Sequence, residues 1–271
     1  MIRGRCIDAA TLGVPGRRSF ELHGTLPPRP RLAIVGSRAM LHAAADAIAV
    51  LVEVAAAHGH ALVSGGAIGV DATAHHAALA RALPQLAVLP CGADRPYPPV
   101  HAPLFAAIAA APGSGLLYSQ PRGTIPARAM FVSRNATLVA LADAVVVVMA
   151  ERRSGSEVTG RLALRRGLPT AVLAGTEGCA ALAAAGARTL ASLRGEPEAL
   201  ALAARAWLRG EATAPRWPPG LAVLQRALAA AGAAGATLDR LGGPAAAMAL
   251  IQAERLGLVQ QVGPGRWVAV A

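Results

Sequence analysis

Two short stretches of this sequence place glycines beside side chains that can hold an anion. Glycine lets the backbone turn sharply and leaves its N–H groups open to a ligand. Hydroxyl and guanidinium groups supply further donors to phosphate oxygens. The candidate phosphate contacts are Gly36, Ser37 and Arg38 in the first stretch, and Ser64, Gly65, Gly66 and Gly69 in the second. The same glycines could also serve tight packing of the chain, and the two roles are compatible.

Each glycine turn follows a short apolar run and precedes a helical pattern. Residues 33–35 and 61–63 are typical of buried strands, with helices expected from about 40 to 58 and from about 70. Because the carboxyl ends of parallel strands meet at one edge of a sheet, both turns should lie at that edge, where open α/β folds bind anions.

The alternation of strand and helix continues to about residue 190. Further strands are expected at 86–89, 115–119, 144–149 and 170–173. We therefore predict an α/β fold: an extended Rossmann-like parallel sheet with helices on both faces.

An aromatic side chain and two polar ones suggest a single-stranded nucleic acid as the ligand. Phe131 precedes Arg134 and Asn135, which indicates a surface edge and not a core segment. Bases can stack on such a ring while the arginine contacts phosphate. Asp71, an acidic residue in a supposed anion site, is expected to orient Arg38 or to cap its own helix. His75 and His76 have no carboxylate or cysteine at metal spacing, so we expect packed or capping histidines and no metal.

The charge of the chain favours a polyanionic partner. The formal net charge is +11, and all 26 basic residues are arginines. A guanidinium can contact phosphate with two donors and can stack on bases. The alternative is a merely solvated basic surface, but the excess favours nucleic acid.

Several other classes of protein are disfavoured. The three cysteines are widely separated, which argues against a disulfide framework or a zinc site and favours a reducing cytoplasm. The apolar runs at 43–57 and 138–150 are interrupted by acidic residues, so neither is expected to span a membrane, and no secretory signal is recognisable. No Ser-His-Asp elbow and no Walker lysine is present, so we expect neither an enzyme nor a cofactor.

Four segments are predicted along the chain. Residues 1–30 are expected to be an irregular lead-in, 31–209 the Rossmann-like core, 210–219 a proline-rich linker and 220–271 a small winged-helix domain of three helices and a hairpin. The third of these helices offers alanines and Met248 where a recognition helix needs polar donors, so sequence-specific duplex reading is not expected.

The order and spacing of the motifs resemble the DNA-processing protein A (DprA/Smf) family. The motifs are Gly36-Ser37-Arg38, Ser64-Gly65-Gly66 with Gly69, Asp71 and His75, Tyr97-Pro98, Phe131 with Arg134 and Asn135, and Ser154-Gly155-Ser156 with Thr159. The resemblance implies a Rossmann-like core that binds single-stranded DNA, and it adds Ser154, Gly155 and Ser156 to the DNA-contact residues. It also implies protection of incoming strands during natural transformation, loading of a RecA-type recombinase, and a homodimer.

The sequence departs from the family pattern at several positions. Gln120 replaces an acidic residue, Ala136 replaces the second arginine of an Arg-Asn-Arg triplet, and Ala174-Gly175 replaces Pro-Gly. The missing second arginine leaves open a second interpretation: a nucleotide-binding sensor or nucleotide-processing enzyme on the same fold. The arginine content and the Phe131 segment favour the DNA-binding interpretation.

Overall fold

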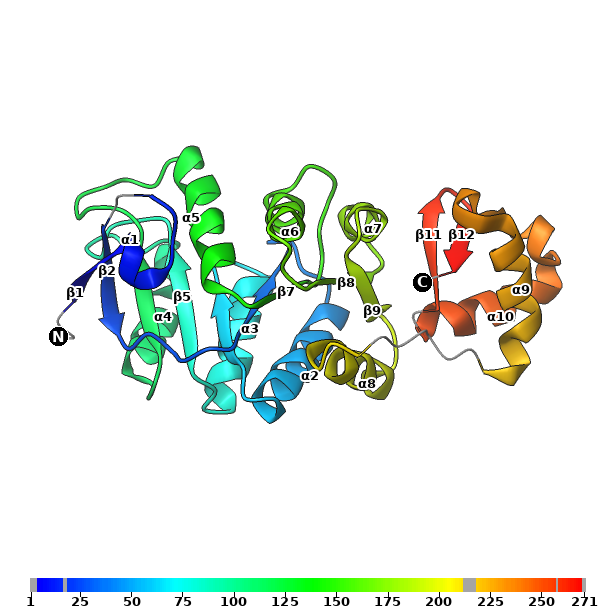
Figure 1. The fold of residues 1–271 in the computed structure, drawn as a ribbon, viewed down its shortest axis with the longest axis horizontal. Coiled ribbons are helices and arrows are strands. Elements are labelled where there is room, and N and C mark those ends of the chain that lie inside the picture. The colour runs from blue at the N-terminus through cyan, green and yellow to red at the C-terminus, as the bar shows by residue number, and fades with distance from the viewer. Residues whose placement is uncertain (1–3, 17–18, 212–217, 257, 270–271) are drawn as a thin grey trace.

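The computed structural model describes residues 4–16, 19–211, 218–256 and 258–269. A long α/β core is followed by a smaller C-terminal unit, and the two lie side by side along the longest axis of the molecule (Figure 1).

Within the described residues, one sheet of nine strands forms the core, in the order β1-β2-β6-β5-β4-β3-β7-β8-β9. The strands from β6 to β9 in this order are parallel. Their bounds are β3 Arg31–Val35, β4 Ala61–Ser64, β5 Gln85–Leu89, β6 Gly115–Tyr118, β7 Ala144–Val147, β8 Thr170–Ala174 and β9 Arg188–Ser192. Strands β4, β5 and β6 follow one another on one side of β3, and β7, β8 and β9 follow one another on the other side. Open α/β folds bind ligands beside such a switch in strand order, at the carboxyl ends of the strands.

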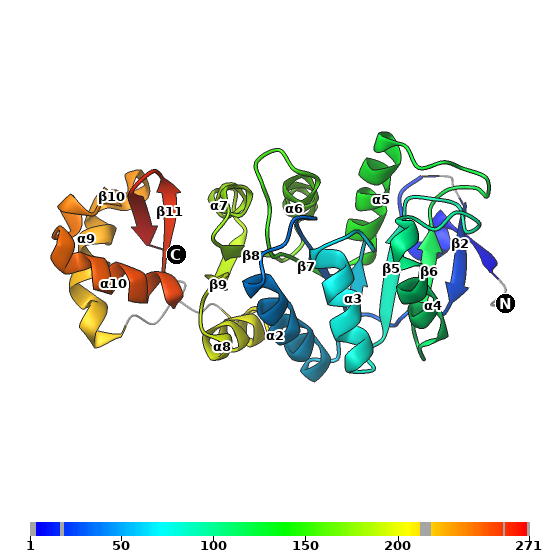
Figure 2. The ribbon, with the colours of Figure 1, turned by 180° about the vertical axis from the view of Figure 1, so that it is seen from behind.

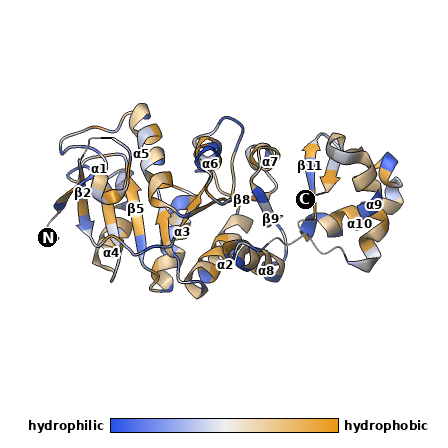
Figure 3. Cartoon of the chain, viewed as in Figure 1, coloured by the Kyte–Doolittle hydropathy of each residue, from blue (hydrophilic) through white to orange (hydrophobic). Residues whose placement is uncertain are grey.

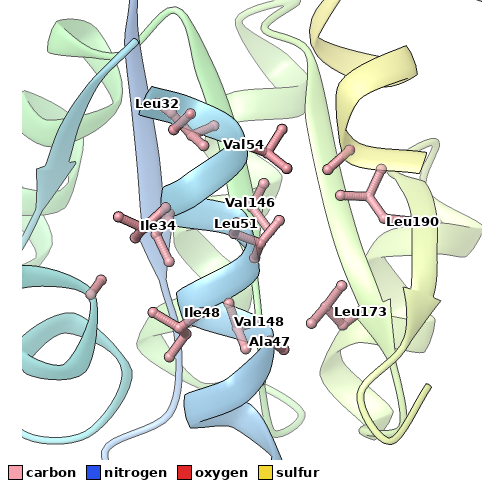
Figure 4. Close-up of a cluster of buried hydrophobic side chains, with 14 of the residues drawn as sticks. Leu32, Ile34, Ala47, Ile48, Leu51, Val54, Val146, Val148, Leu173 and Leu190 are labelled. Atoms are coloured by element: carbon pink, nitrogen blue, oxygen red, sulfur yellow. The ribbon is translucent and has the colours of Figure 1, made fainter. Parts of the chain in front are cut away.

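Helices cover both faces of this sheet, as predicted (Figures 1 and 2). On one face lie α2 Ala43–Ala57, α3 Val70–Ala80, α4 Ala102–Ala110 and α8 Pro197–Leu208, and on the other lie α5 Arg128–Leu141, α6 Gly155–Arg165 and α7 Glu177–Ala184. Alternate residues of β3 point to opposite faces. Leu32 and Ile34 pack with Ile48 and Leu51 of α2 in one core cluster (Figure 4). Ala33 and Val35 belong to the cluster on the other face.

The prediction that residues 1–30 are irregular is wrong for much of this segment. The chain forms β1 Arg5–Asp8, α1 Ala9–Leu12 and β2 Ser19–Gly24. Strand β2 pairs antiparallel with β6 and so extends the sheet at one edge. The signal is a short alternation: Phe20 and Leu22 are buried, whereas Ser19, which begins the strand, is exposed.

The C-terminal unit has its own core, built around Leu224, Leu228, Leu250 and Val259. Its elements are α9 Ala222–Ala231, β10 Ala236–Thr237, a single 3-10 turn Asp239–Leu241, α10 Pro244–Arg255, β11 Val259–Gly263 and β12 Arg266–Ala269. The expected second helix is thus only one turn long. The winged-helix assignment and the boundaries at 209 and 220 stay predictions, and residues 212–217 of the predicted linker lie outside the described residues.

The apolar residues concentrate inside both units (Figure 3). No helix in the described part of the chain is long and apolar enough to cross a membrane.

Candidate nucleic-acid interface

The two glycine turns lie against each other at the carboxyl edge of the sheet. The backbone N–H of Val70 donates to the carbonyl of Ser37 at 3.2 Å. A Cβ on Gly69, whose φ is +85°, would lie 2.5 Å from that same carbonyl oxygen, and one on Gly36 would lie 2.6 Å from Val70. Glycine is therefore required at both positions for packing, whatever ligand the turns hold.

Ser64 is not available to a ligand, and its prediction as a DNA contact is corrected. Its side chain is fully buried, and its hydroxyl donates to the carbonyl of Ile34 at 2.6 Å. The hydroxyl thus joins β4 to β3 inside the sheet. Gly65 and Gly66, which follow it, are also buried, whereas Gly69 is partly exposed.

Arg134 is buried, contrary to the prediction that it contacts phosphate from an exposed edge. Its residue exposure is 5%, and Nη1 lies 3.8 Å from Asp71 Oδ2 and 3.4 Å from the carbonyl of Val88. A Cβ on Gly65 would fall 1.3 Å from Nη1, so the guanidinium occupies the space that a side chain there would need. Asp71 was expected to orient Arg38 or to cap its own helix. It pairs with Arg134 instead, and its Oδ2 also accepts from the backbone N–H of Ala67 at 3.4 Å.

The Asp71–Arg134 pair is held in a low-dielectric position. Burial raises the pKa of Asp71, opposed mainly by the positive charge of Arg134. Burial likewise lowers the pKa of Arg134, opposed by Asp71. The Nε of Arg134 has no hydrogen-bond partner among the described residues. Each partner therefore offsets the cost of burying the other.

A small hollow opens above this pair. It encloses about 30 Å³, and its lining includes Arg38, Gly65, Ile68, Tyr97, Phe131 and Arg134. A volume of this size admits water-sized groups. Four residues on which the sequence prediction centred, Arg38, Gly65, Phe131 and Arg134, thus meet at one place.

The rim of the hollow is aromatic and cationic. The guanidinium carbon of Arg38, an exposed residue, lies 5.3 Å from the centroid of the Phe131 ring. The Tyr97 ring meets Phe131 edge to face at 5.7 Å between centroids. The rim is open to solvent, since Arg38 and Tyr97 are exposed and Phe131 is partly exposed.

The remaining predicted residues lie along the same edge: Asn135 on α5, and Ser154, Gly155 and Ser156 at the start of α6. Asn135 Nδ2 is 3.5 Å from the carbonyl of Gly155. Ser154 caps α6, its hydroxyl oxygen accepting from the Glu157 N–H at 3.2 Å. Gly155 is exposed, and Ser154 and Ser156 are partly exposed. These side chains lie beside the hollow's lining residues on α5 without lining the hollow themselves.

His75 is packed inside the protein, as expected, whereas His76 is exposed. His75 is fully buried, and its Nδ1 lies 2.6 Å from Gln85 Oε1. Burial lowers the pKa of His75 to about 4, so the ring is neutral at physiological pH. Among the described residues no group of three or more His, Cys, Asp or Glu side chains is placed to hold a metal ion.

Comparison with known proteins identifies the family. Residues 22–197 match the family model described as DNA recombination-mediator protein A, which is well over half of the chain. The chain belongs to this family. The putative DNA processing protein DprA of Mycobacterium tuberculosis H37Rv is 41% identical over 163 residues, which are 58% of this chain and 40% of that protein. DprA of Streptococcus pneumoniae is 32% identical over 170 residues, 60% of this chain and 59% of that protein. The chain thus spans about half the length of these curated relatives.

Solved structures of two DprA proteins share the fold. The S. pneumoniae DprA structure has a TM-score of 0.59 and 28% identity, over 64% of this chain and 63% of that one. The Helicobacter pylori structure, described as giving insights into a unique single-stranded DNA binding mode of that DprA, has a TM-score of 0.64 and 23% identity, over 78% of this chain and 98% of that one. The DprA resemblance and the α/β fold expected from the sequence are confirmed.

Tyr97 and Ile68 line the hollow of this DprA-family chain but were not among the predicted contacts. Tyr97 is 38% and Ile68 51% exposed. Tyr97 carried a signal: it is one of two tyrosines in the chain and lies in a proline-rich loop directly after a strand. Exposed aromatic and apolar residues beside a glycine turn are typical of ligand contacts.

Proposed function

We propose that this chain binds single-stranded DNA along the carboxyl edge of β5, β4, β3 and β7, as an accessory protein without catalysis of its own. The observation that carries the proposal is the position of Arg38 over Phe131 at the exposed rim of the hollow, with Tyr97 beside it. An unpaired base can stack on the aromatic rim while a guanidinium contacts phosphate. In a duplex the base faces are already stacked on each other, so this edge should prefer single strands.

Two further observations support this proposal. The net charge of +11 favours a polyanion. The contact of Asn135 with the carbonyl of Gly155, and the cap formed by Ser154, continue the polar edge beyond the hollow, which favours a DNA strand over the alternative ligand, a free nucleotide.

The proposal also covers the role of the chain in natural transformation. We infer that the chain protects incoming strands and assists a RecA-type recombinase during natural transformation, as a homodimer in the cytoplasm. The description of its family as a recombination mediator supports this role.

The test is fluorescence anisotropy with a labelled oligonucleotide, comparing the full chain with Arg38→Ala. Arg165→Ala is a matched control, because Arg165 is exposed at the far end of α6, toward the opposite edge of the sheet. The Arg38 variant should lose about tenfold in affinity, roughly 1.4 kcal/mol. Its salt dependence should become shallower by about 0.7 for each phosphate that the arginine neutralises in the wild type. The control should match the wild type.

Two competitors complete the test. Unlabelled duplex should compete poorly, and free nucleotide should not displace the oligonucleotide. Equal competition by duplex, or complete displacement by nucleotide, would contradict the proposed function.

A further inference from the structure

The loop between β7 and α6 presents two successive arginines at the same edge of the sheet. Arg152 and Arg153 are both exposed, and the Arg152 side chain is 53% exposed. The φ of Arg153 is +58°, a left-handed conformation that is uncommon for a residue with a side chain. Such strain persists only where the surroundings hold it in place.

A buried carboxylate holds this loop. Glu157 is 4% exposed, and its Oε2 accepts from the backbone N–H of Arg153 at 2.5 Å. Its Oε1 lies 2.7 Å from Arg161 Nη2 and 3.8 Å from Arg152 Nη1. Burial alone would raise the pKa of the Glu157 carboxyl. The hydrogen bonds from Arg161 and from the Arg153 N–H have the larger combined effect, so the pKa is lowered. The carboxylate therefore stays ionised and fixes the loop backbone.

The guanidinium of Arg153 makes no hydrogen bond or ion pair within the described part of the chain. That of Arg152 lies only at the outer limit of an ion pair with Glu157. The strained backbone thus places the charge of Arg153 in solvent, while Arg152 also lines a cleft whose lining includes Glu177 and Glu254. Glu151, exposed next to the two arginines, offsets part of their charge.

The loop continues the proposed DNA-binding edge. Strands β4, β3 and β7 are neighbours, and the Ser37 N–H donates to the carbonyl of Met149 at 2.9 Å, which joins the first glycine turn to the end of β7. Two strand spacings separate the end of β4 from the end of β7, about 10 Å. At the duplex rise of roughly 3.4 Å per nucleotide, that distance is about three nucleotides of a stacked strand and fewer of an extended one. Asn135 and Gly155, in contact between α5 and α6, lie between the hollow and the loop.

We propose that Arg152 and Arg153 form a second phosphate-binding subsite, onto which a single strand continues from the rim of the hollow across the start of α6. This inference rests on the proposed function, since it assigns the path of the same DNA strand. The DNA then crosses the edge of the sheet where the order of the β-strands switches. Its bases lie on the aromatic rim at one end, and its phosphates lie on the arginine loop at the other.

The experiment compares Arg152→Ala/Arg153→Ala with Arg165→Ala/Arg166→Ala in the full chain. The control pair is also exposed and adjacent and ends the same helix, so both variants remove two charges. With an oligonucleotide of about 15 nucleotides, a typical single-strand site size, the loop variant should lose about tenfold in affinity. Its salt slope should become shallower by about 1.4, which is two phosphates at 0.7 each, while the control keeps the wild-type slope.

Two further comparisons make the test specific: a shorter oligonucleotide, and a variant that removes a negative charge and should strengthen binding. An oligonucleotide shorter than the span from the rim to the loop, about two nucleotides, should bind the loop variant and the wild type equally. Glu151→Gln should tighten binding of the longer one. If the loop variant and its control behave alike while Arg38→Ala still weakens binding, the second subsite is wrong and the proposed function stands. If Arg38→Ala also has no effect, the proposed function itself fails.

Discussion

Arg134 Nη1 lies 3.8 Å from Asp71 Oδ2, with both side chains more than nine-tenths buried. The pair joins α5 to α3 directly beneath the hollow, and it fills the space over Gly65. The sequence pattern predicts Arg134 to be a phosphate ligand, but the residue is buried and forms part of the lining of the hollow. In the proposed function, contact with DNA is therefore assigned to Arg38, which is exposed on the rim.

Arg134→Met should strongly destabilise the protein, because it leaves the Asp71 carboxylate buried without its ion-pair partner. Removing one member of a buried pair costs about 3–5 kcal/mol, which urea unfolding of the full chain measures. The double variant Asp71→Asn/Arg134→Met should recover part of that stability. A single variant within about 0.5 kcal/mol of the wild type, the range of ordinary surface changes, would show that the pair is not structural.

Gly65→Ala should also destabilise the protein. Its Cβ would lie 1.3 Å from Arg134 Nη1 and 2.6 Å from Asp71 Oδ2, so the guanidinium must move away from its partner. Forcing extra volume into a packed site costs about 1–3 kcal/mol. Gly155→Ala is the control, since the nearest atom, Asn135 Nδ2, is 4.0 Å away from its Cβ. Thermal unfolding in which the two variants melt alike would contradict the described packing.

Stability should fall as the pH decreases from about 6.5 to about 4, in part because of His75. Burial lowers the pKa of His75 from 6.5 to about 4, so between these values the unfolded chain binds the proton and the folded chain does not. The stability present above this window is lost on acidification, by roughly 3 kcal/mol at 1.36 kcal/mol per pKa unit. His75→Gln should remove this part of the pH dependence. Equal losses in variant and wild type, measured by urea unfolding across the window, would assign the effect to other groups.

Local patterns in the sequence predicted the core of the fold well. The apolar runs at 86–89 and 170–173 correspond to β5 Gln85–Leu89 and β8 Thr170–Ala174, and the helix expected at 40–58 to α2 Ala43–Ala57. A buried strand and an amphipathic helix leave their period in the residues themselves, so these elements need no knowledge of distant partners.

Features that depend on distant partners were missed. The sequence did not predict the burial of Arg134, because its ion-pair partner Asp71 is distant in the sequence, with β5 and β6 between them. A local signal did exist, since Arg134, Leu138 and Leu141 are spaced at i, i+4 and i+7 and all lie on the buried face of α5. The pairing of β2 with β6 is likewise a tertiary contact that the short alternation around Phe20 signals only weakly.

Ultraviolet crosslinking of the full chain to a thymine-rich single strand, followed by mass spectrometry, tests the central claim most directly. Crosslinks form only between groups in contact, and bases stacked on the rim would touch Phe131 and Tyr97. The crosslinked peptides should contain one of these two residues, and Phe131→Ala should reduce their yield, with duplex DNA giving little product. Crosslinks confined to the C-terminal unit at 222–269, with none at Phe131 or Tyr97, would contradict the assignment of the DNA-binding edge.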